Sequence, residues 1–230
     1  MTKSLTNAEL EHLLNFIGYG DLDACAWFLG MEEAGGGEAN ILTRLKFRRV
    51  EDCVEAHALL GMTKHHSGKK VIQPTWRGMC YIMLRLEGVQ PSTENIRDYQ
   101  ANHLGRLHNS SLLCELMPIP KPSVASWGYE ELIPQFTSRD EYYHAIKPRR
   151  IEFLRQVLQE HRPRIVIGYG KNYWPDYKEL FLGETFAIEG QFAVSRGQAG
   201  VVVLTDHFTA RSMNGKLDEI VEIVRDYSLR

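Results

Sequence analysis

Four short apolar runs, each separated from the next by helical patterning, constrain the fold of this 230-residue chain more than any other feature. The runs cover residues 24–29, 111–117, 164–170 and 201–205, and the third of them ends in a glycine turn. Continuous apolar character is typical of strands buried on both faces, as in a parallel sheet covered by helices. We therefore expect an α/β fold in which residues 1–230 form a single three-layer domain. A central four-stranded, mostly parallel sheet would be flanked by helices.

The segments between these runs carry the periodicity and capping signals of helices. Helical patterns cover residues 6–17, 38–60, 73–86, 92–107, 138–161, 171–182 and 213–227. Two prolines are expected to act as breaks: Pro118 ends the second strand, and Pro148 interrupts the long helix. The sequence favours a short hairpin over 186–194 and an ordered loop over 123–137.

Composition limits the class of protein and its surroundings. The net charge of −2 excludes a polybasic nucleic-acid coat, but not an enzyme whose basic residues gather on one face. The four cysteines are widely spaced, which favours buried free thiols in a reducing compartment; an iron–sulfur or zinc site built from all four is the alternative. No signal peptide or membrane-spanning apolar run is present, so we expect a cytoplasmic protein without a membrane partner.

Three segments are predicted to meet at the carboxyl edge of the sheet, where open α/β sheets bind their ligands. They cover residues 30–37, 115–122 and 206–214, and they carry Glu32, Glu33, Glu115 and His207. Carboxylates, a histidine and glycine-rich backbone suit acid/base or electrostatic catalysis on a ligand that contains phosphates. The alternative is a tight strand-to-helix turn with solvated glutamates and a histidine that caps the last helix. The basic loop 64–70 is either a solvated turn or a phosphate contact.

These segments resemble, in order, the motifs of the uracil-DNA glycosylase superfamily in its divergent branches. Gly30-Met31-Glu32-Glu33-Ala34 is similar to the motif that orients the attacking water. The strand end beginning at Glu115 is similar to the base-reading segment, where an asparagine is usual. His207-Phe208-Thr209-Ala210-Arg211-Ser212 is similar to the closing motif, a histidine followed by a loop inserted into the minor groove. The resemblance covers most of the chain.

The resemblance implies catalytic roles for three side chains. Cleavage of an N-glycosidic bond develops positive charge on the sugar and negative charge on the departing base. Glu32 is the first choice for the carboxylate that stabilises the sugar and aligns water, and Glu33 is the alternative. His207 would donate a hydrogen bond to the base O2 as charge grows there.

The base-binding residues implied by the resemblance are Glu115, Ala34, Met31 and Phe208. A carboxylate at position 115 accepts from the exocyclic amino group of a cytosine ring, and repels O4 of uracil unless it is protonated. Alternatively, Glu115 points away and the register is shifted by one. Ala34 stands where uracil-specific members place a tyrosine against C5, so the pocket should tolerate a bulky C5 group.

DNA contacts are implied for the glycine run and for the ends of the other two motifs. These residues are Gly35, Gly36, Gly37, Lys121, Arg211, Ser212, Met213 and Asn214. Backbone N–H groups of the glycine run would hold a phosphate. Arg211 or Met213 would insert when the target base is flipped from double-stranded DNA. The resemblance implies no cofactor, no metal and a monomer.

The expected function is a monofunctional DNA glycosylase that leaves an abasic site, acting on glucosylated hydroxymethylcytosine of phage DNA in anti-phage defence. The alternative within this class is repair of uracil or another deaminated base. A nucleotide-cofactor enzyme such as a methyltransferase would use the loop 30–37, but no Gly-x-Gly-x-x-Gly or phosphate-loop lysine motif is present. A non-catalytic DNA-binding relative is the remaining alternative.

Overall fold

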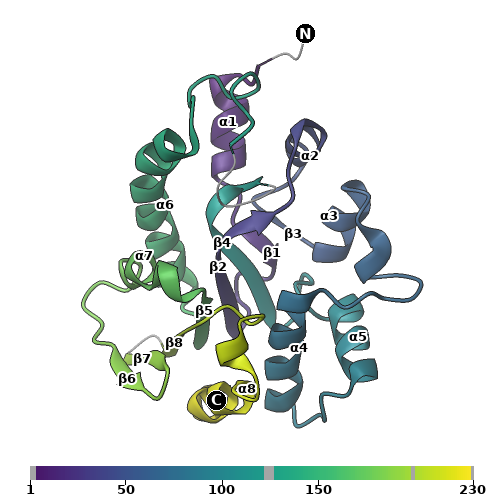
Figure 1. Ribbon diagram of the computed structural model, residues 1–230, viewed down its shortest axis with the longest axis vertical. Coiled ribbons are helices and arrows are strands. Elements are labelled where there is room, and N and C mark those ends of the chain that lie inside the picture. Colours follow the sequence, from purple (N-terminus) through teal and green to yellow (C-terminus); the bar gives the residue numbers. More distant parts are fainter. Residues whose placement is uncertain (1–3, 122–126, 198–199, 229–230) are drawn as a thin grey trace.

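The computed structural model describes residues 4–121, 127–197 and 200–228, and it has an α/β fold built on one mixed sheet. Eight strands pair in the order β3-β1-β4-β2-β5-β8-β7-β6. Helices cover both faces of this sheet, so that the molecule has three layers (Figure 1).

Helices and strands are interspersed along the chain. The strands are β1 (Gly18–Gly20), β2 (Ala26–Ala34), β3 (Val50–Glu51), β4 (Ser111–Lys121), β5 (Ile165–Tyr169), β6 (Ala187–Glu189), β7 (Phe192–Gly197) and β8 (Gly200–Thr205). The α-helices are α1 (Asn7–Leu14), α2 (Glu38–Arg44), α3 (Cys53–Leu59), α4 (Pro74–Leu86), α5 (Thr93–Asn102), α6 (Arg139–His161), α7 (Trp174–Lys178) and α8 (Leu217–Ser228). Short 3-10 turns are η1 (Thr63–His65), η2 (Lys171–Tyr173) and η3 (Arg211–Met213).

The four predicted strands form a parallel block at the middle of the sheet. Strand β2 pairs in parallel with β4 and with β5, and β5 pairs in parallel with β8. The sheet has more strands than the four predicted, because β1 and β3 extend one side and the β6–β7 hairpin extends the other. The extra strands are two to six residues long, too short for strong periodicity. Of these extra strands, only the β6–β7 hairpin was predicted, over residues 186–194.

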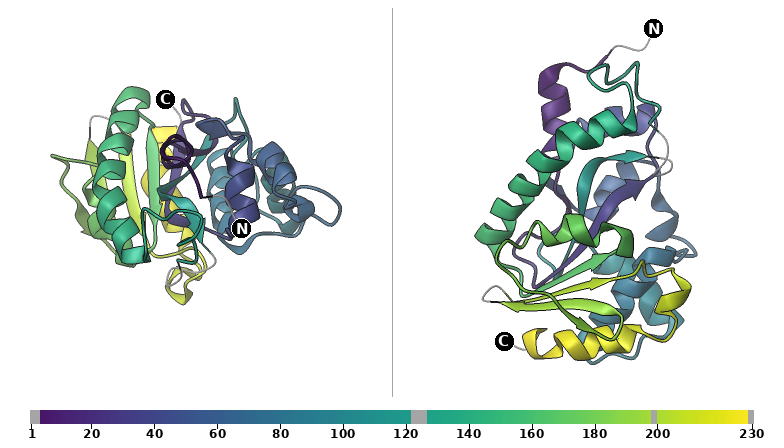
Figure 2. Two further views of the ribbon diagram at one scale, coloured as in Figure 1. Left: turned by 90° about the horizontal axis from the view of Figure 1, so that it is seen from above. Right: turned by 60° about the vertical axis from the view of Figure 1, so that its left-hand side comes forward.

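Alternating side chains of the central strands enter two separate hydrophobic cores. Trp27, Leu29 and Met31 of β2 pack in one core, while Ala26 and Phe28 pack in the other. Helices α1, α6 and α7 contribute to the first core, and α3, α4, α5 and α8 contribute to the second. Figure 2 shows the two helical layers on opposite sides of the sheet. Burial on both faces explains why these strands read as continuous apolar runs.

Both predicted proline breaks were wrong. Strand β4 continues through Pro118 and Pro120 to Lys121, because β1 pairs with β4 only as far as Cys114 and leaves one edge open beyond it. Helix α6 continues through Pro148 and ends at His161, where Arg162 caps it with a φ of +47°. Tertiary packing against the sheet therefore overrides the local breaking signal.

Several predicted boundaries also change. The helix expected over 38–60 is two helices separated by β3, and Asp52 caps the second of them. The last helix begins at Leu217, later than predicted, because η3 occupies the preceding turn. In the loop expected over 123–137, residues 123–126 lie outside the described part of the chain. Trp127 and Tyr129, in the rest of that loop, are buried.

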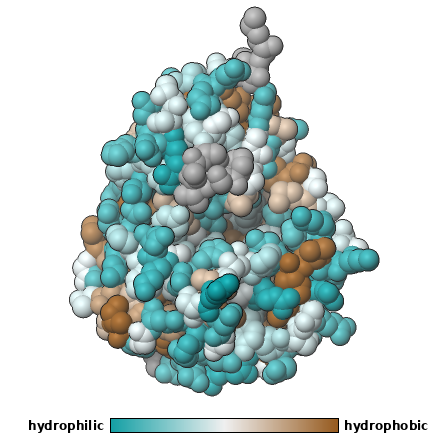
Figure 3. Space-filling model, viewed as in Figure 1, coloured by the Kyte–Doolittle hydropathy of each residue, from teal (hydrophilic) through white to brown (hydrophobic). Residues whose placement is uncertain are grey.

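The surface in Figure 3 mixes hydrophilic residues with small hydrophobic groups. Within the described ranges, none of the helices combines the length and the apolar composition that crossing a membrane requires.

Candidate functional site

A cavity of about 170 Å³ lies at the carboxyl ends of the central parallel strands. Residues from all three predicted motifs line it: Glu32, Glu33, Ala34, Glu115 and His207. The parallel pairing of β4, β2, β5 and β8 brings the ends of these strands to one edge of the sheet. Segments more than 170 positions apart in sequence therefore contribute to the same cavity.

Glu32, the first choice for the catalytic carboxylate, is held by two partners from other elements. Its Oε2 atom lies 2.8 Å from Lys121 Nζ and accepts a hydrogen bond of 2.5 Å from the Tyr143 hydroxyl. Its Oε1 atom is buried and has no hydrogen-bond partner among the described residues. The carboxylate is thus fixed in orientation, with one oxygen left to accept from a water or a ligand.

Glu33, the alternative, belongs to a different network. Its Oε2 atom lies 2.7 Å from the Arg44 guanidinium and accepts a 2.9 Å hydrogen bond from the Tyr19 hydroxyl. Arg44 is 4% exposed, and Glu33 compensates its buried positive charge. We interpret Glu33 mainly as the group that ties β2 to β1 and α2, and Glu32 as the better oriented of the two for chemistry.

Glu115 lines the cavity and does not point away from it. The Tyr169 hydroxyl donates to its Oε1 atom at 3.0 Å, while its Oε2 atom is buried without a partner in the described part of the chain. Burial raises the pKa of Glu115 to about 8. Gly30 permits this arrangement, because a Cβ atom there would lie 2.2 Å from Glu115 Oε2 and 2.4 Å from the Tyr169 hydroxyl.

His207 follows β8 by two residues and reaches the cavity from the opposite side of the block. Its Nδ1 atom lies 2.7 Å from the Thr209 hydroxyl and 3.3 Å from the Thr209 backbone N–H, and acceptance from this N–H favours the tautomer with the ring proton on Nε2. The Nε2 atom faces the Thr75 hydroxyl at 3.5 Å. Burial lowers the pKa of His207, and the nearby Asp206 carboxylate opposes this change. A neutral imidazole with a cavity-facing N–H is suited to donate to a ligand oxygen.

The remaining base-binding predictions have mixed outcomes. Ala34 is exposed and lines the cavity, so its small side chain leaves that side of the cavity open to solvent. Met31 is 5% exposed and packs in the hydrophobic core on the other side of β2, because successive strand residues point to opposite faces. Phe208 stacks on Tyr169 with ring centroids 5.2 Å apart and supports that side chain from behind.

The glycine run is less available for a phosphate than predicted. The Gly35 N–H donates to the Lys121 carbonyl, and the Gly37 N–H donates to the Tyr129 hydroxyl. The helix that follows, α2, has only seven residues. Lys121 is 1% exposed and its ammonium pairs with Glu32, so its prediction as a surface DNA contact was wrong. The β2–β4 pairing turns this lysine inward, which sequence alone did not indicate.

The loop after His207 presents some of its predicted residues to solvent. Arg211, Ser212 and Asn214 are exposed, and the Ser212 hydroxyl donates to Asp206 at 2.6 Å. Met213 is 3% exposed and packs against the second core, so it is not placed to insert into DNA. Arg211 remains the candidate for insertion.

Several residues of the site were missed by the sequence analysis. Tyr169 ends the third apolar run and follows the same strand-end rule as Glu115, so that rule could have identified it. Tyr143 and Tyr19 reach the carboxylates from elements with no local signal of function. The basic loop also gave no signal that His65 is buried, with its Nδ1 atom 2.7 Å from the Val71 carbonyl.

The arrangement provides an oriented carboxylate, a neutral histidine donor and a buried carboxyl group that is protonated at neutral pH. Such a site can recognise a planar polar ligand and stabilise opposite charges on the two sides of a breaking bond. In a scan against models of known protein families and a search of curated proteins, nothing matches this chain.

Proposed function

We propose that the protein is a monofunctional DNA glycosylase of the uracil-DNA glycosylase type, which flips a modified pyrimidine out of duplex DNA and hydrolyses its N-glycosidic bond. The observation that carries this proposal is the convergence of Glu32, Glu115 and His207 on one small cavity. These side chains come from three separate motifs. In one cavity they can stabilise the sugar, donate to the departing base and recognise its edge. The central strands in the order β4-β2-β5-β8 supply the common edge.

In this mechanism, Glu32 Oε1 accepts from the attacking water while Lys121 and Tyr143 hold Oε2. The carboxylate also stabilises the positive charge that develops on the sugar. His207 Nε2 donates to the base O2, where negative charge grows as the bond breaks. Both groups act from fixed positions, so little reorganisation is needed during the reaction.

The size of the cavity supports a base as the ligand. Its volume of about 170 Å³ is below the ~300–1,000 Å³ of sites for drug-sized ligands and cofactors. This favours a flipped base over the nucleotide cofactor of a methyltransferase. Because Ala34 is exposed at the rim, a large group on C5 of a bound pyrimidine can extend outward. We therefore propose glucosylated hydroxymethylcytosine in phage DNA as the substrate, and anti-phage defence as the role.

A second candidate substrate is uracil, and the state of Glu115 favours it. With its pKa raised to about 8 by burial, the carboxyl group is protonated at pH 7. A neutral carboxyl group donates to O4 of uracil instead of repelling it, and it can also pair with cytosine through N3 and the amino group. The experiment below therefore also tests substrates for the repair of uracil or another deaminated base.

The test is alkaline cleavage of matched duplexes that carry glucosylated hydroxymethylcytosine, uracil or hypoxanthine at one position. We expect cleavage with the first substrate, and a loss of about a hundredfold or more in rate for Glu32→Gln and for His207→Ala. Glu131→Gln, at an exposed position outside the cavity, is the matched control and should keep the wild-type rate.

Each other result selects a different function. Cleavage only with uracil or hypoxanthine would assign the protein to base repair. Saturable duplex binding without cleavage, unchanged in both variants, would indicate a non-catalytic DNA-binding protein. Equal rates in the wild type and both site variants would refute the proposed catalytic residues.

A further inference from the structure

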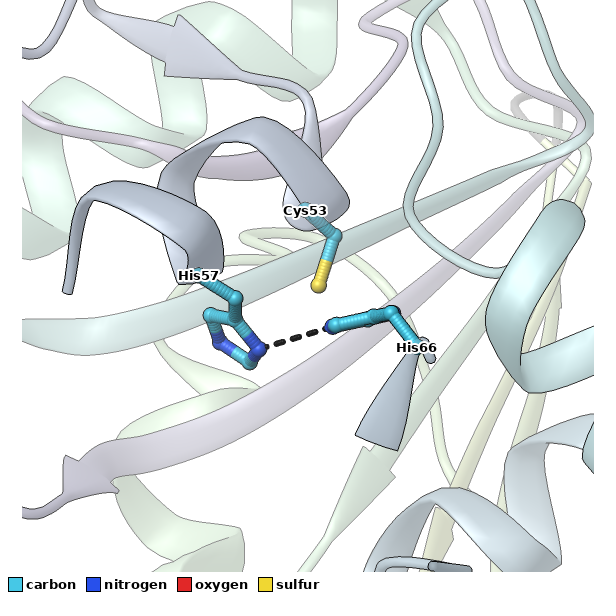
Figure 4. Close-up of side chains that lie close together, drawn as sticks. All are labelled: Cys53, His57 and His66. Carbon is cyan, nitrogen blue, oxygen red and sulfur yellow. Dashed lines mark hydrogen bonds between the residues drawn. The ribbon is translucent and has the colours of Figure 1, made fainter. Parts of the chain in front are cut away.

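Three potential metal ligands lie together beside the cavity, outside the group of residues assigned above to catalysis. They are Cys53, His57 and His66, and one ligand atom from each lies within 4.8 Å of the others. Figure 4 shows the three side chains pointing toward one another. His57 Nδ1 and His66 Nε2 are 2.9 Å apart.

Local structure places these side chains with little freedom. Cys53 and His57 are four residues apart on α3, so they lie on the same face of the helix. His66 follows η1, in a loop held by buried Gln100, whose Nε2 donates to the His65 carbonyl at 2.7 Å. Two independently anchored elements therefore present their donors to one point.

The donor types suit a divalent cation. An imidazole in its neutral form carries one nitrogen lone pair that can bind a metal, and a thiol binds as the thiolate. A bound divalent cation would release the thiol proton to solvent and take the thiolate as its ligand, which leaves one net positive charge at the site instead of two.

We propose that Cys53 Sγ, His57 Nδ1 and His66 Nε2 bind a zinc ion, with the fourth position left to water. One thiolate and two imidazoles are typical zinc ligands, and together they form a tetrahedral site with an open position. At Zn–N distances of 2.0–2.1 Å, the two nitrogens of such a site lie about 3.3 Å apart. The present 2.9 Å separation needs an outward shift of only a few tenths of an ångström.

The zinc ion would fix one wall of the cavity. His57 stacks on Trp76 with ring centroids 5.2 Å apart, and both residues line the cavity together with His65. Metal binding would join α3 to the loop after η1 and so hold this aromatic wall in place. This inference does not depend on the proposed glycosylase activity, because it concerns binding of the metal alone.

The first test is the metal content of full-length protein purified without a metal-affinity step. We expect about one zinc ion per chain by mass spectrometry. Replacement with Co²⁺ should produce a thiolate-to-cobalt charge-transfer absorption. Cys53→Ser should lower metal affinity by more than ~100-fold, since even the loss of an outer-shell partner costs 10–100-fold. The matched control is Cys80→Ser, at a cysteine equally buried on α4 and outside the cluster, which should keep the metal.

The proposal is overturned if wild-type protein supplied with Zn²⁺ retains none after gel filtration, or if Cys53→Ser binds it as tightly as the wild type does. A histidine–histidine hydrogen bond without metal would then explain the cluster. Should Cys53→Ser fail to fold, the wild-type Co²⁺ spectrum decides: its charge-transfer band supports a thiolate ligand, and its absence refutes one.

Discussion

At the scale of single residues, Glu115 is the group whose surroundings depart furthest from those of an ordinary glutamate. The carboxyl group lies over Gly30 of β2, with the hydroxyl of Tyr169 on β5 as its hydrogen-bond partner. Tyr169 lowers the pKa, but burial outweighs it and raises the pKa from 4.5 to about 8. The folded state is therefore more stable when the carboxyl group of Glu115 is protonated.

This pKa predicts a pH dependence of stability. Between about pH 4.5 and pH 8 the folded chain binds the Glu115 proton and the unfolded chain does not, so the free energy of unfolding falls as pH rises. The slope is about 1.4 kcal/mol per pH unit inside this window. Glu115→Gln removes the titration, so the variant should gain stability relative to the wild type between pH 5 and pH 8.

Urea unfolding of both proteins at several pH values measures this effect. A constant difference in free energy across the window would contradict a raised pKa for Glu115. The same variant changes base recognition if the site binds a pyrimidine, since an amide donates and accepts but cannot ionise.

At the scale of elements, α3 depends on the residue that caps it. Asp52 Oδ1 accepts from the backbone N–H groups of Val54 and Glu55, and its Oδ2 lies 2.6 Å from Arg106 Nε. Burial alone would raise the pKa of Asp52, but these hydrogen bonds outweigh it and lower the pKa below 3.8. The cap thus fixes the start of the helix that carries Cys53.

Asp52→Ala should lower the free energy of unfolding by about 2–3 kcal/mol at pH 7, from loss of the cap and of the charged hydrogen bond. Asp52→Asn keeps a capping oxygen and should cost less. The stabilisation by the carboxylate is complete above pH 3.8 and is lost as pH falls through the lowered pKa. Chemical denaturation at pH 7 and near pH 3 checks both statements. Equal costs for Ala and Asn would contradict a role for the cap.

At the scale of the whole molecule, Arg150 connects three parts of the fold. Its guanidinium, on α6, donates to the carbonyl groups of Leu14, Phe16, Glu115 and Leu116. These acceptors lie at the end of α1, before β1 and in β4. Burial lowers the pKa of Arg150 to about 10, so the side chain stays charged at neutral pH.

Arg150→Met should destabilise the protein by about 3–5 kcal/mol, because it leaves several buried carbonyl groups without donors. The melting temperature should fall by about 2–4 °C for each kcal/mol. The neighbour Arg149 is the matched control: its side chain is 62% exposed and pairs with Glu11, so Arg149→Met should cost less than about 1 kcal/mol. Similar melting temperatures for the two variants would contradict the role of Arg150.

The α/β class and the four central strands could be predicted because buried parallel strands read as continuous apolar runs. The edge of the sheet that holds the cavity followed from the same pattern, which led to Glu32, Glu115 and His207. Short edge strands such as β1 and β3 could not be predicted, because two or three residues carry no periodicity.

The local sequence determined the central strands and the residue types available near their carboxyl ends. Only the tertiary structure decided which side chains pair. Lys121 was predicted to contact DNA, but it is the buried partner of Glu32. Met31 and Met213 were predicted to contact the base and the DNA, but both pack in the hydrophobic cores. Tyr143 contacts Glu32 from an element far away in the chain, and His57 and His66 meet only because α3 and the loop after η1 fold against each other. Ion pairs, pKa shifts and ligand clusters depend on distances between such elements, and these distances are set by packing of the whole domain.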